Sequence, residues 1–202
     1  MNERQQRLLG ANEFFRTVSF SRLVTDGVMS DEQARVLTDA LHARKTIVVA
    51  GPFGSGKTTL MQALANEQAT LLPDSFVALI EDPEELQCAM SNQTRYVVSE
   101  ELPALQRMRR AATDGARRII FGEVREGTDL GVFLDCVACG VSGATTLYAK
   151  SPGEVFERLT TLLKSDGTVQ RELLDLIDIV VFMSEGSFRV ESIASGRDLA
   201  GR

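Results

Sequence analysis

The pattern of apolar and polar positions divides the chain into a helical beginning and a longer part in which short apolar runs alternate with mixed segments. Residues 1–45 are typical of helices, and Ser30-Asp31-Glu32-Gln33 is a capping-box pattern that predicts a helix from there to about Arg44. From Lys45 onward the alternation predicts a mostly parallel β-sheet flanked by helices, the arrangement of an α/β protein.

The apolar runs give the positions of the expected strands, which are Thr46–Ala50, Phe76–Ile80, Arg95–Val98, Arg118–Phe121, Ala144–Leu147 and Ile177–Met183. A final hairpin is expected to pair Ile179–Met183 with Phe188–Ile193 across Glu185-Gly186-Ser187. The expected helices are Lys57–Asn66, Pro103–Thr113, Thr128–Cys139, Pro152–Lys164 and Val169–Leu174. Before Pro152, Ser151 is a capping residue, and Glu154 is expected to complete a capping box.

The clearest chemical signal is Gly51-Pro52-Phe53-Gly54-Ser55-Gly56-Lys57-Thr58, a complete G-x-x-x-x-G-K-T phosphate-binding loop that Thr59 follows into a helix. An apolar strand precedes it, as this motif requires, so a chance glycine-rich turn is the weaker interpretation. Backbone N–H groups and the positive end of the helix would bind a phosphate chain. Lys57 is expected to reach the terminal phosphates and Thr58 to bind Mg²⁺. We therefore expect a RecA-like P-loop domain over residues 46–202, with residues 1–45 as a helical N-terminal segment.

The composition limits which binding partners and which cellular compartment are expected. The 202 residues include 22 Lys and Arg against 28 Asp and Glu, a formal net charge of −6. This balance argues against broad coating of nucleic acid or of an anionic membrane. No run of about 18 apolar residues predicts a membrane span, and the first residues lack an apolar signal core. The expectation is a cytoplasmic protein that does not insert into a membrane.

Three cysteines, an odd number, do not suggest a disulfide framework. Cys136 and Cys139 form a C-x-x-C pair, which could be redox-active or half of a zinc site. The pair follows a segment that is typical of a buried helix, there is no second pair, and His42 is the single histidine. A structural role in the core is therefore the favoured interpretation.

Carboxylates follow two of the expected strands. Glu123 comes after Arg118–Phe121 in a pattern typical of a Walker B element, where a carboxylate holds Mg²⁺ through water or orients the attacking water. Glu81 and Asp82 follow another apolar strand and should lie at the same edge of the sheet. Solvated acidic turns are the alternative interpretation. Two acidic groups beside a phosphate-binding loop favour a hydrolase.

Other P-loop classes fit less well. There is no N-K-x-D guanine-specificity element and no obvious arginine-rich lid of a small-molecule kinase. Several arginines lie in or near the expected helix Pro103–Thr113 and could bind nucleic acid or serve a neighbouring subunit's nucleotide, although a solvated basic face is the favoured interpretation. They are Arg107, Arg109, Arg110, Arg117 and Arg118.

Four blocks, in order, resemble the secretion and traffic ATPases, especially the TrbB-type ATPases of conjugal transfer. These ATPases belong to type IV secretion systems and are relatives of the pilus retraction motor PilT. The four blocks are the loop Gly51–Thr58, an Asp box from Leu79 to Cys88, a Walker B segment from Ile119 to Arg125, and a degenerate His box from Gly140 to Ala149. The likeness covers roughly residues 20 to 195, and the Asp box together with Gly-Glu-Val-Arg is specific to this superfamily.

The resemblance implies a RecA-like motor that binds ATP and Mg²⁺ at subunit interfaces of a hexameric ring. Lys57 and Thr58 would bind phosphate and Mg²⁺, Glu123 would be the Walker B carboxylate, Asp82 would join the metal site, Glu81 would position water, and Arg125 would couple the site to its surroundings. Such motors act at the cytoplasmic base of inner-membrane secretion or pilus machines, so a peripheral place at that membrane is implied.

The chain departs from the family in three places. Val141 and Tyr148 stand where the His box has histidines, so that Thr146 or Tyr148 would have to supply a hydroxyl instead. Thr113 and Ala116 stand where an arginine and a proline are common. The family's separate N-terminal domain is expected to be absent or reduced to residues 1–45. The leading hypothesis is an oligomeric ATPase; the others are a non-hydrolysing nucleotide-binding paralogue and a nucleic-acid-associated RecA-type protein.

Overall fold

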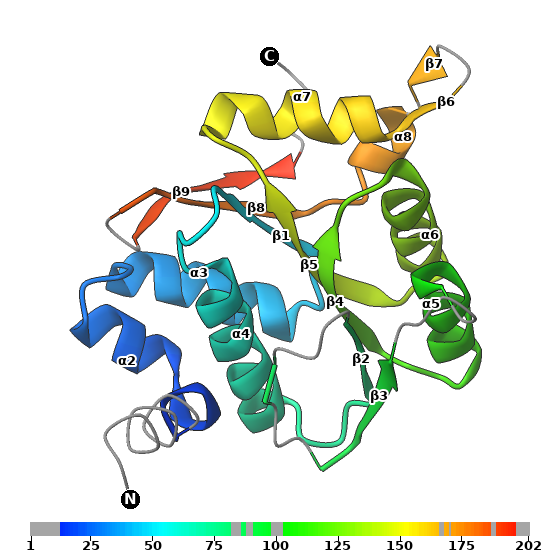
Figure 1. Ribbon diagram of the computed structural model, residues 1–202. Coiled ribbons are helices and arrows are strands. Elements are labelled where there is room, and N and C mark those ends of the chain that lie inside the picture. Colours follow the sequence, from blue (N-terminus) through cyan, green and yellow to red (C-terminus); the bar gives the residue numbers. More distant parts are fainter. Residues whose placement is uncertain are drawn as a thin grey trace, which may run out of the picture.

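The computed structural model describes residues 13–81, 86–87, 91–97, 103–165, 168–169, 171–186 and 189–196. Its centre is a seven-stranded sheet with the order β3-β2-β4-β5-β1-β8-β9 (Figure 1). All neighbouring strands are parallel except β8 and β9, which form the expected antiparallel hairpin. The strands are β1 Ile47–Gly51, β2 Val77–Glu81, β3 Gln93–Val97, β4 Arg118–Val124, β5 Ser142–Tyr148, β8 Ile179–Met183 and β9 Val190–Ser195. The mostly parallel α/β sheet is confirmed.

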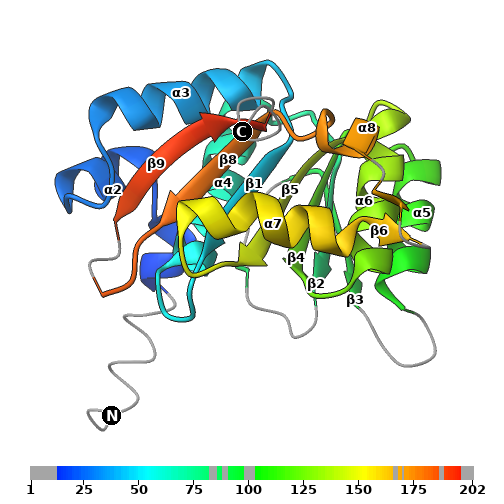
Figure 2. The same cartoon turned by 90° about the horizontal axis from the view of Figure 1, so that it is seen from above.

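Helices cover both faces of this sheet. Figure 1 shows α2, α3 and α4 on one side and α5 to α8 on the other, and Figure 2 shows α7 lying across the second face. The helices are α2 Phe20–Thr25, α3 Asp31–His42, α4 Lys57–Leu71, α5 Ala104–Thr113, α6 Gly127–Ala138, α7 Pro152–Leu162 and α8 Arg171–Leu174. Among the described residues, no helix is both long enough and apolar enough to cross a membrane.

The central strand β1 supplies side chains to both layers, because successive residues of a strand point to opposite faces. Ile47 and Val49 pack into the hydrophobic cluster beneath α2, α3 and α4, whereas Val48 and Ala50 pack into the cluster beneath α5 to α8. A strand buried on both faces explains the uninterrupted apolar run before the phosphate-binding loop.

The N-terminal part of the chain is bound to α4 by hydrogen bonds and by hydrophobic packing. The side-chain amide of Asn66 donates a hydrogen bond of 2.8 Å to the Val18 carbonyl, and the Phe20 N–H donates one of 2.9 Å to the Glu67 carboxylate. Leu23 of α2 and Leu37 of α3 are buried in the cluster that contains the α4 side chains. The boundary between residues 45 and 46 stays a prediction.

Capping follows the sequence at one helix and departs from it at another. Both hydrogen bonds of the Ser30–Gln33 capping box are present, which confirms the start of α3. At α7 the Ser151 hydroxyl accepts from the Glu154 N–H, but the Glu154 carboxylate accepts from the Lys150 N–H at 2.6 Å. The expected capping box at Glu154 is therefore wrong, because its side chain reaches one residue beyond the capping position.

Two short strands replace the ends of two expected helices. β6 Lys164–Ser165 pairs antiparallel with β7 Thr168–Val169, so α7 ends at Leu162 and α8 begins at Arg171. The sequence between the two strands is Asp166-Gly167, a pair that favours tight hairpin turns. The expected helices Pro152–Lys164 and Val169–Leu174 were therefore each too long at the end that meets these strands.

Candidate nucleotide-binding site

The phosphate-binding loop connects the end of β1 at Gly51 to the start of α4 at Lys57. Gly54 and Gly56 have φ values of 72° and 95°, the left-handed region that glycine adopts without strain. A Cβ at Gly51 would lie 2.5 Å from the Met183 carbonyl oxygen, so the end of β8 also requires a glycine there. These constraints fold the loop into a tight arch before α4.

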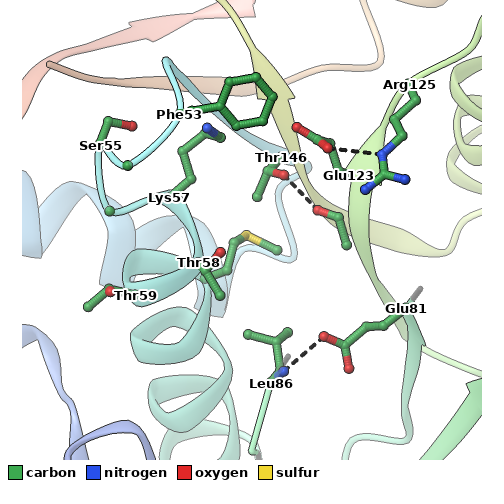
Figure 3. Close-up of a pocket in the computed structure, with 14 residues that line it drawn as sticks. Phe53, Ser55, Lys57, Thr58, Thr59, Glu81, Leu86, Glu123, Arg125 and Thr146 are labelled. Carbon is green, nitrogen blue, oxygen red and sulfur yellow. Dashed lines mark hydrogen bonds and ion pairs between the residues drawn. The ribbon is translucent and has the colours of Figure 1, made fainter. Parts of the chain in front are cut away.

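A cavity of about 420 Å³ opens beside this loop (Figure 3). One wall is formed by the loop and the first turn of α4, and the other by the carboxyl ends of β2, β4 and β5, where α/β proteins bind ligands. The predicted site residues that line it are Phe53, Gly54, Ser55, Gly56, Lys57, Thr58, Thr59, Glu81, Glu123 and Arg125. Gly51 and Pro52 are not among its lining residues; they contribute backbone carbonyls behind it.

Lys57 is buried at the base of the loop. Its ammonium donates hydrogen bonds of 2.9 Å to the Gly51 carbonyl and 2.8 Å to the Pro52 carbonyl. The ammonium also lies 5.8 Å from the centre of the Phe53 ring, within reach of a cation–π contact. A lysine held in this way carries a positive charge at the cavity wall.

The start of α4 suits an anion. Its capping residue is Gly56, which has no side chain to accept the first N–H groups of the helix. The positive end of the helix dipole adds to the charge of Lys57. Within the described part of the chain, the buried Ser55 hydroxyl has no hydrogen-bond partner. N–H groups that no side chain caps, an ammonium and the unpaired Ser55 hydroxyl together fit a chain of phosphates.

The sequence predicted that Glu123 would follow the strand, but the structure places it within β4. A β-bulge at Gly122 shifts the register, so that Phe121 opposes Thr145 and Glu123 opposes Thr146. The extra residue bends the strand and turns the next side chain, as bulges commonly do beside active sites. The Glu123 carboxylate accepts a hydrogen bond of 3.0 Å from the Arg125 guanidinium (Figure 3).

Glu81 is the last residue of β2 and is almost fully buried, with 2% of its side chain exposed. One carboxylate oxygen accepts the Leu86 N–H at 2.9 Å, and the other forms an ion pair with Arg95 of β3. The Arg95 guanidinium also donates to the Leu86 carbonyl at 2.7 Å. Glu81 therefore lines the cavity while both of its carboxylate oxygens take part in a local network.

Arg95 was missed in the sequence. The available signal was a charged residue within an expected strand next to the Asp box. It opposes Leu79 in the register between β2 and β3, and this places its side chain near Glu81 on the same face.

The expected magnesium ligands are only partly brought together. Thr58 and Glu123 both line the cavity, and Asp82 lies outside the described residues. Among those residues, no group of three or more His, Cys, Asp or Glu side chains could hold a metal ion alone. A hydroxyl and a carboxylate beside a phosphate site suit Mg²⁺, which is commonly held by few protein groups together with phosphate oxygens.

Comparison with known proteins identifies the family of this chain. The family described as "Type II/IV secretion system protein" matches residues 12–182. The chain belongs to this family. It is 30% identical to conjugal transfer protein TrbB of Rhizobium radiobacter over 168 residues, which cover 82% of this chain and 52% of the relative. The resemblance to TrbB-type proteins is thereby confirmed.

Solved structures agree with the family assignment. The VirB11 ATPase of the Brucella suis type IV secretion system, crystallised with sulphate, matches 91% of this chain and 57% of its own length, with a TM-score of 0.73 and 26% identity. The pilus retraction motor PilT, with bound ADP, matches 82% of this chain and 47% of its own, with a TM-score of 0.62 and 20% identity, and shows the fold alone. The RecA-like P-loop fold is confirmed. The chain spans about half the length of the relatives it matches.

The two positions that the resemblance assigns to His-box histidines lie at opposite ends of β5. Val141 is buried just before the strand begins, and Tyr148 is its last residue. Neither lines the cavity, whereas Thr146 does, and the Thr146 hydroxyl donates a hydrogen bond of 2.7 Å to the Gly122 carbonyl. Of the two hydroxyls expected to replace an imidazole, only the one on Thr146 is in place.

The arginine cluster of this secretion-family chain is smaller than expected. Arg118 is buried at the start of β4, where its guanidinium donates to the carbonyls of Lys45 and Gly143, and burial lowers its pKa to about 10. It belongs to the core, because β4 is an interior strand that lies between β2 and β5. Arg109 and Arg117 are exposed, and Arg110 pairs with Asp114 at 2.9 Å on the surface.

The C-x-x-C pair is buried only in part. Cys136 is buried in α6, whereas Cys139 is the exposed residue that ends the helix. Burial raises the pKa of the Cys136 thiol to about 11. This disfavours the thiolate that redox chemistry and metal binding require, which supports the structural role for Cys136 and corrects the expected burial of Cys139.

Proposed function

We propose that this chain is the ATP-binding and ATP-hydrolysing motor domain of a type IV secretion or conjugal-transfer machine. The observation that carries the proposal is the single cavity in which the Lys57 ammonium and the uncapped start of α4 face the carboxylates of Glu81 and Glu123. Membership of the secretion family supports the machine to which it would belong.

The loop residues Gly51–Thr59 would bind the triphosphate. Lys57 would exchange its two backbone carbonyl partners for phosphate oxygens, which are stronger acceptors because they are charged. Thr58 and Glu123, with Asp82, are the residues that would hold Mg²⁺. When bound, this ion neutralises negative charge on the phosphates.

Glu123 and Glu81 divide the remaining tasks. Glu123 is the better candidate to accept a proton from the attacking water or to orient it, because 23% of its side chain is exposed and its carboxylate is paired with the mostly exposed Arg125. Glu81 would act mainly by holding the Leu86 backbone at the cavity edge. Arg125 would link Glu123 to groups outside the cavity, since 62% of its side chain is exposed.

Assembly and place in the cell are also proposals. The family supports a homo-oligomer, a hexameric ring by resemblance, with nucleotide at the subunit contacts. The partners would be inner-membrane secretion or pilus components, and the location would be cytoplasmic and peripheral to that membrane. Nucleic-acid binding is disfavoured by the net charge of −6 and by the burial of Arg118.

A second candidate is a nucleotide-binding subunit that does not hydrolyse ATP. It is favoured by the ion pair that occupies Glu81 and by the absence of histidine at Val141 and Tyr148. Such a subunit would use ATP to order an interface.

Phosphate release from ATP with Mg²⁺ separates the two candidates. We expect the intact protein to release phosphate and Glu123→Gln to abolish release while ATP binding persists. Glu157→Gln, which removes an exposed carboxylate on α7, is the matched control and should leave the rate unchanged. ATP binding with no phosphate release by the unmodified chain would favour the non-hydrolysing subunit, and absence of ATP binding would contradict both.

A further inference from the structure

Phe53 is an exposed aromatic residue of the phosphate-binding loop. It is 76% exposed, and Val36 is the other large apolar side chain exposed in the described part of the chain. Phe53 also lines the cavity beside Lys57.

The Phe53 ring rests on the ring of Tyr148. The two ring centres are 4.9 Å apart, with an angle of 35° between the planes. Tyr148 ends β5 and lies opposite Gly51 in the register with β1, so its position is fixed by the sheet. The stack therefore holds the apex of the loop in contact with a strand of the central sheet. Aromatic pairs of this kind add stability beyond the area they bury.

The same ring covers the Lys57 ammonium. The ammonium lies 5.8 Å from the ring centre, so both are on the same side of the cavity (Figure 3), and the ammonium donates to the Gly51 and Pro52 carbonyls. This side is where a lysine of this motif meets terminal phosphates. A ring there keeps water from one side of the ammonium.

We propose that the stacked pair Phe53–Tyr148 is a positioning device for the terminal phosphates of the bound nucleotide. Tyr148 holds Phe53, and Phe53 holds the loop apex and shields Lys57. The proposal rests on the proposed nucleotide binding. It assigns the function of Tyr148 to its ring, not to a hydroxyl that replaces a histidine.

The size of the effect follows from the stack. Without it, the apex Pro52-Phe53-Gly54 would have to be ordered when the nucleotide binds, and that cost lowers affinity. An aromatic pair contributes enough for its loss to weaken Mg-ATP binding about 2- to 12-fold. The change should lie mainly in faster dissociation. Inorganic tripolyphosphate should lose the same factor, because the stack lies over the phosphate end of the site.

The experiment measures Mg-ATP and Mg-tripolyphosphate affinity by calorimetry, and ATP dissociation by stopped flow. The variants are Phe53→Ala, Tyr148→Ala and their double variant, with Tyr148→Phe and Phe53→Tyr as conservative replacements. Val36→Ala controls for loss of an exposed apolar side chain elsewhere. All variants are compared at one protein concentration, and light scattering measures the mass of each.

We expect both alanine variants to weaken the two ligands alike, the double variant to be no weaker than the worse single variant, and Tyr148→Phe to bind as the unmodified chain does. Unchanged affinity in Phe53→Ala would overturn the proposal, as would a loss in Tyr148→Phe equal to that in Tyr148→Ala. A change in mass without a change in affinity would also overturn it, by placing Phe53 in a subunit contact. If the unmodified chain binds neither ligand, the proposed function itself fails.

Discussion

The buried ion pair between Glu81 and Arg95 gives the sharpest prediction for stability. Replacing Arg95 with methionine keeps much of the apolar length of the side chain but leaves the buried Glu81 carboxylate without its ion-pair partner, although it still accepts the Leu86 N–H. Removing one member of a buried pair costs about 3–5 kcal/mol. Because a quarter of the Arg95 side chain is exposed, we expect a loss near the lower end, about 3 kcal/mol.

Urea unfolding followed by circular dichroism would measure this loss. In a thermal unfolding experiment, a loss of about 3 kcal/mol corresponds to a fall of roughly 6–12 °C in the melting temperature for a chain of this size. Arg22→Met is the matched control, since its pair with Asp26 lies on the surface, with 59% of the Arg22 side chain exposed, and such pairs contribute about 0–1 kcal/mol.

A second variant tests the cause of the loss. Replacing both partners, in Glu81→Leu with Arg95→Met, removes the uncompensated charge and should recover most of the stability. If Arg95→Met costs no more than Arg22→Met, the ion pair is not an important part of the fold. If the double variant is no more stable than Arg95→Met alone, the loss comes from packing and not from the buried charge.

Three further changes test other parts of the structure. Gly143→Ala should cost about 1–3 kcal/mol in urea unfolding, because a Cβ would lie 2.3 Å from the Phe133 ring; an unchanged midpoint would refute this close approach. Burial and the hydrogen bond to a carboxylate raise the pKa of Tyr96 to about 12, above the unfolded value of about 10, so its contribution is complete below pH 10 and is lost as the pH rises toward 12. Tyr96→Phe should therefore show a smaller fall in stability over that interval, and equal slopes would count against the prediction. In the native protein at pH 8, iodoacetamide should modify Cys139 much faster than Cys136, whose pKa is raised to about 11 by burial; equal rates by mass spectrometry would contradict this.

The strands and the phosphate-binding loop could be predicted because their signals are local. The apolar run before Gly51 and the helix after Thr58 are contiguous in the sequence, and the structure confirms both as β1 and α4. The capping box at Ser30 is equally local and is confirmed.

The rest of the site depends on which residues of different strands meet. The bulge at Gly122 places Glu123 inside β4, and no local pattern marks where one strand takes an extra residue. The pairing of Arg95 with Glu81 and the stack of Phe53 on Tyr148 join segments that only the strand order brings together. The burial of Arg118 has the same origin, since β4 lies in the middle of the sheet.

The most direct test of the central claim is a calorimetric titration of the protein with Mg-ATP, with Lys57→Ala and Lys164→Ala titrated alongside. Lys57 is buried in the loop, whereas Lys164 is exposed in β6. The site predicts saturable binding by the unmodified chain and by Lys164→Ala, and a loss of at least tenfold in affinity for Lys57→Ala. Equal affinity in all three proteins would mean that nucleotide does not bind at this loop.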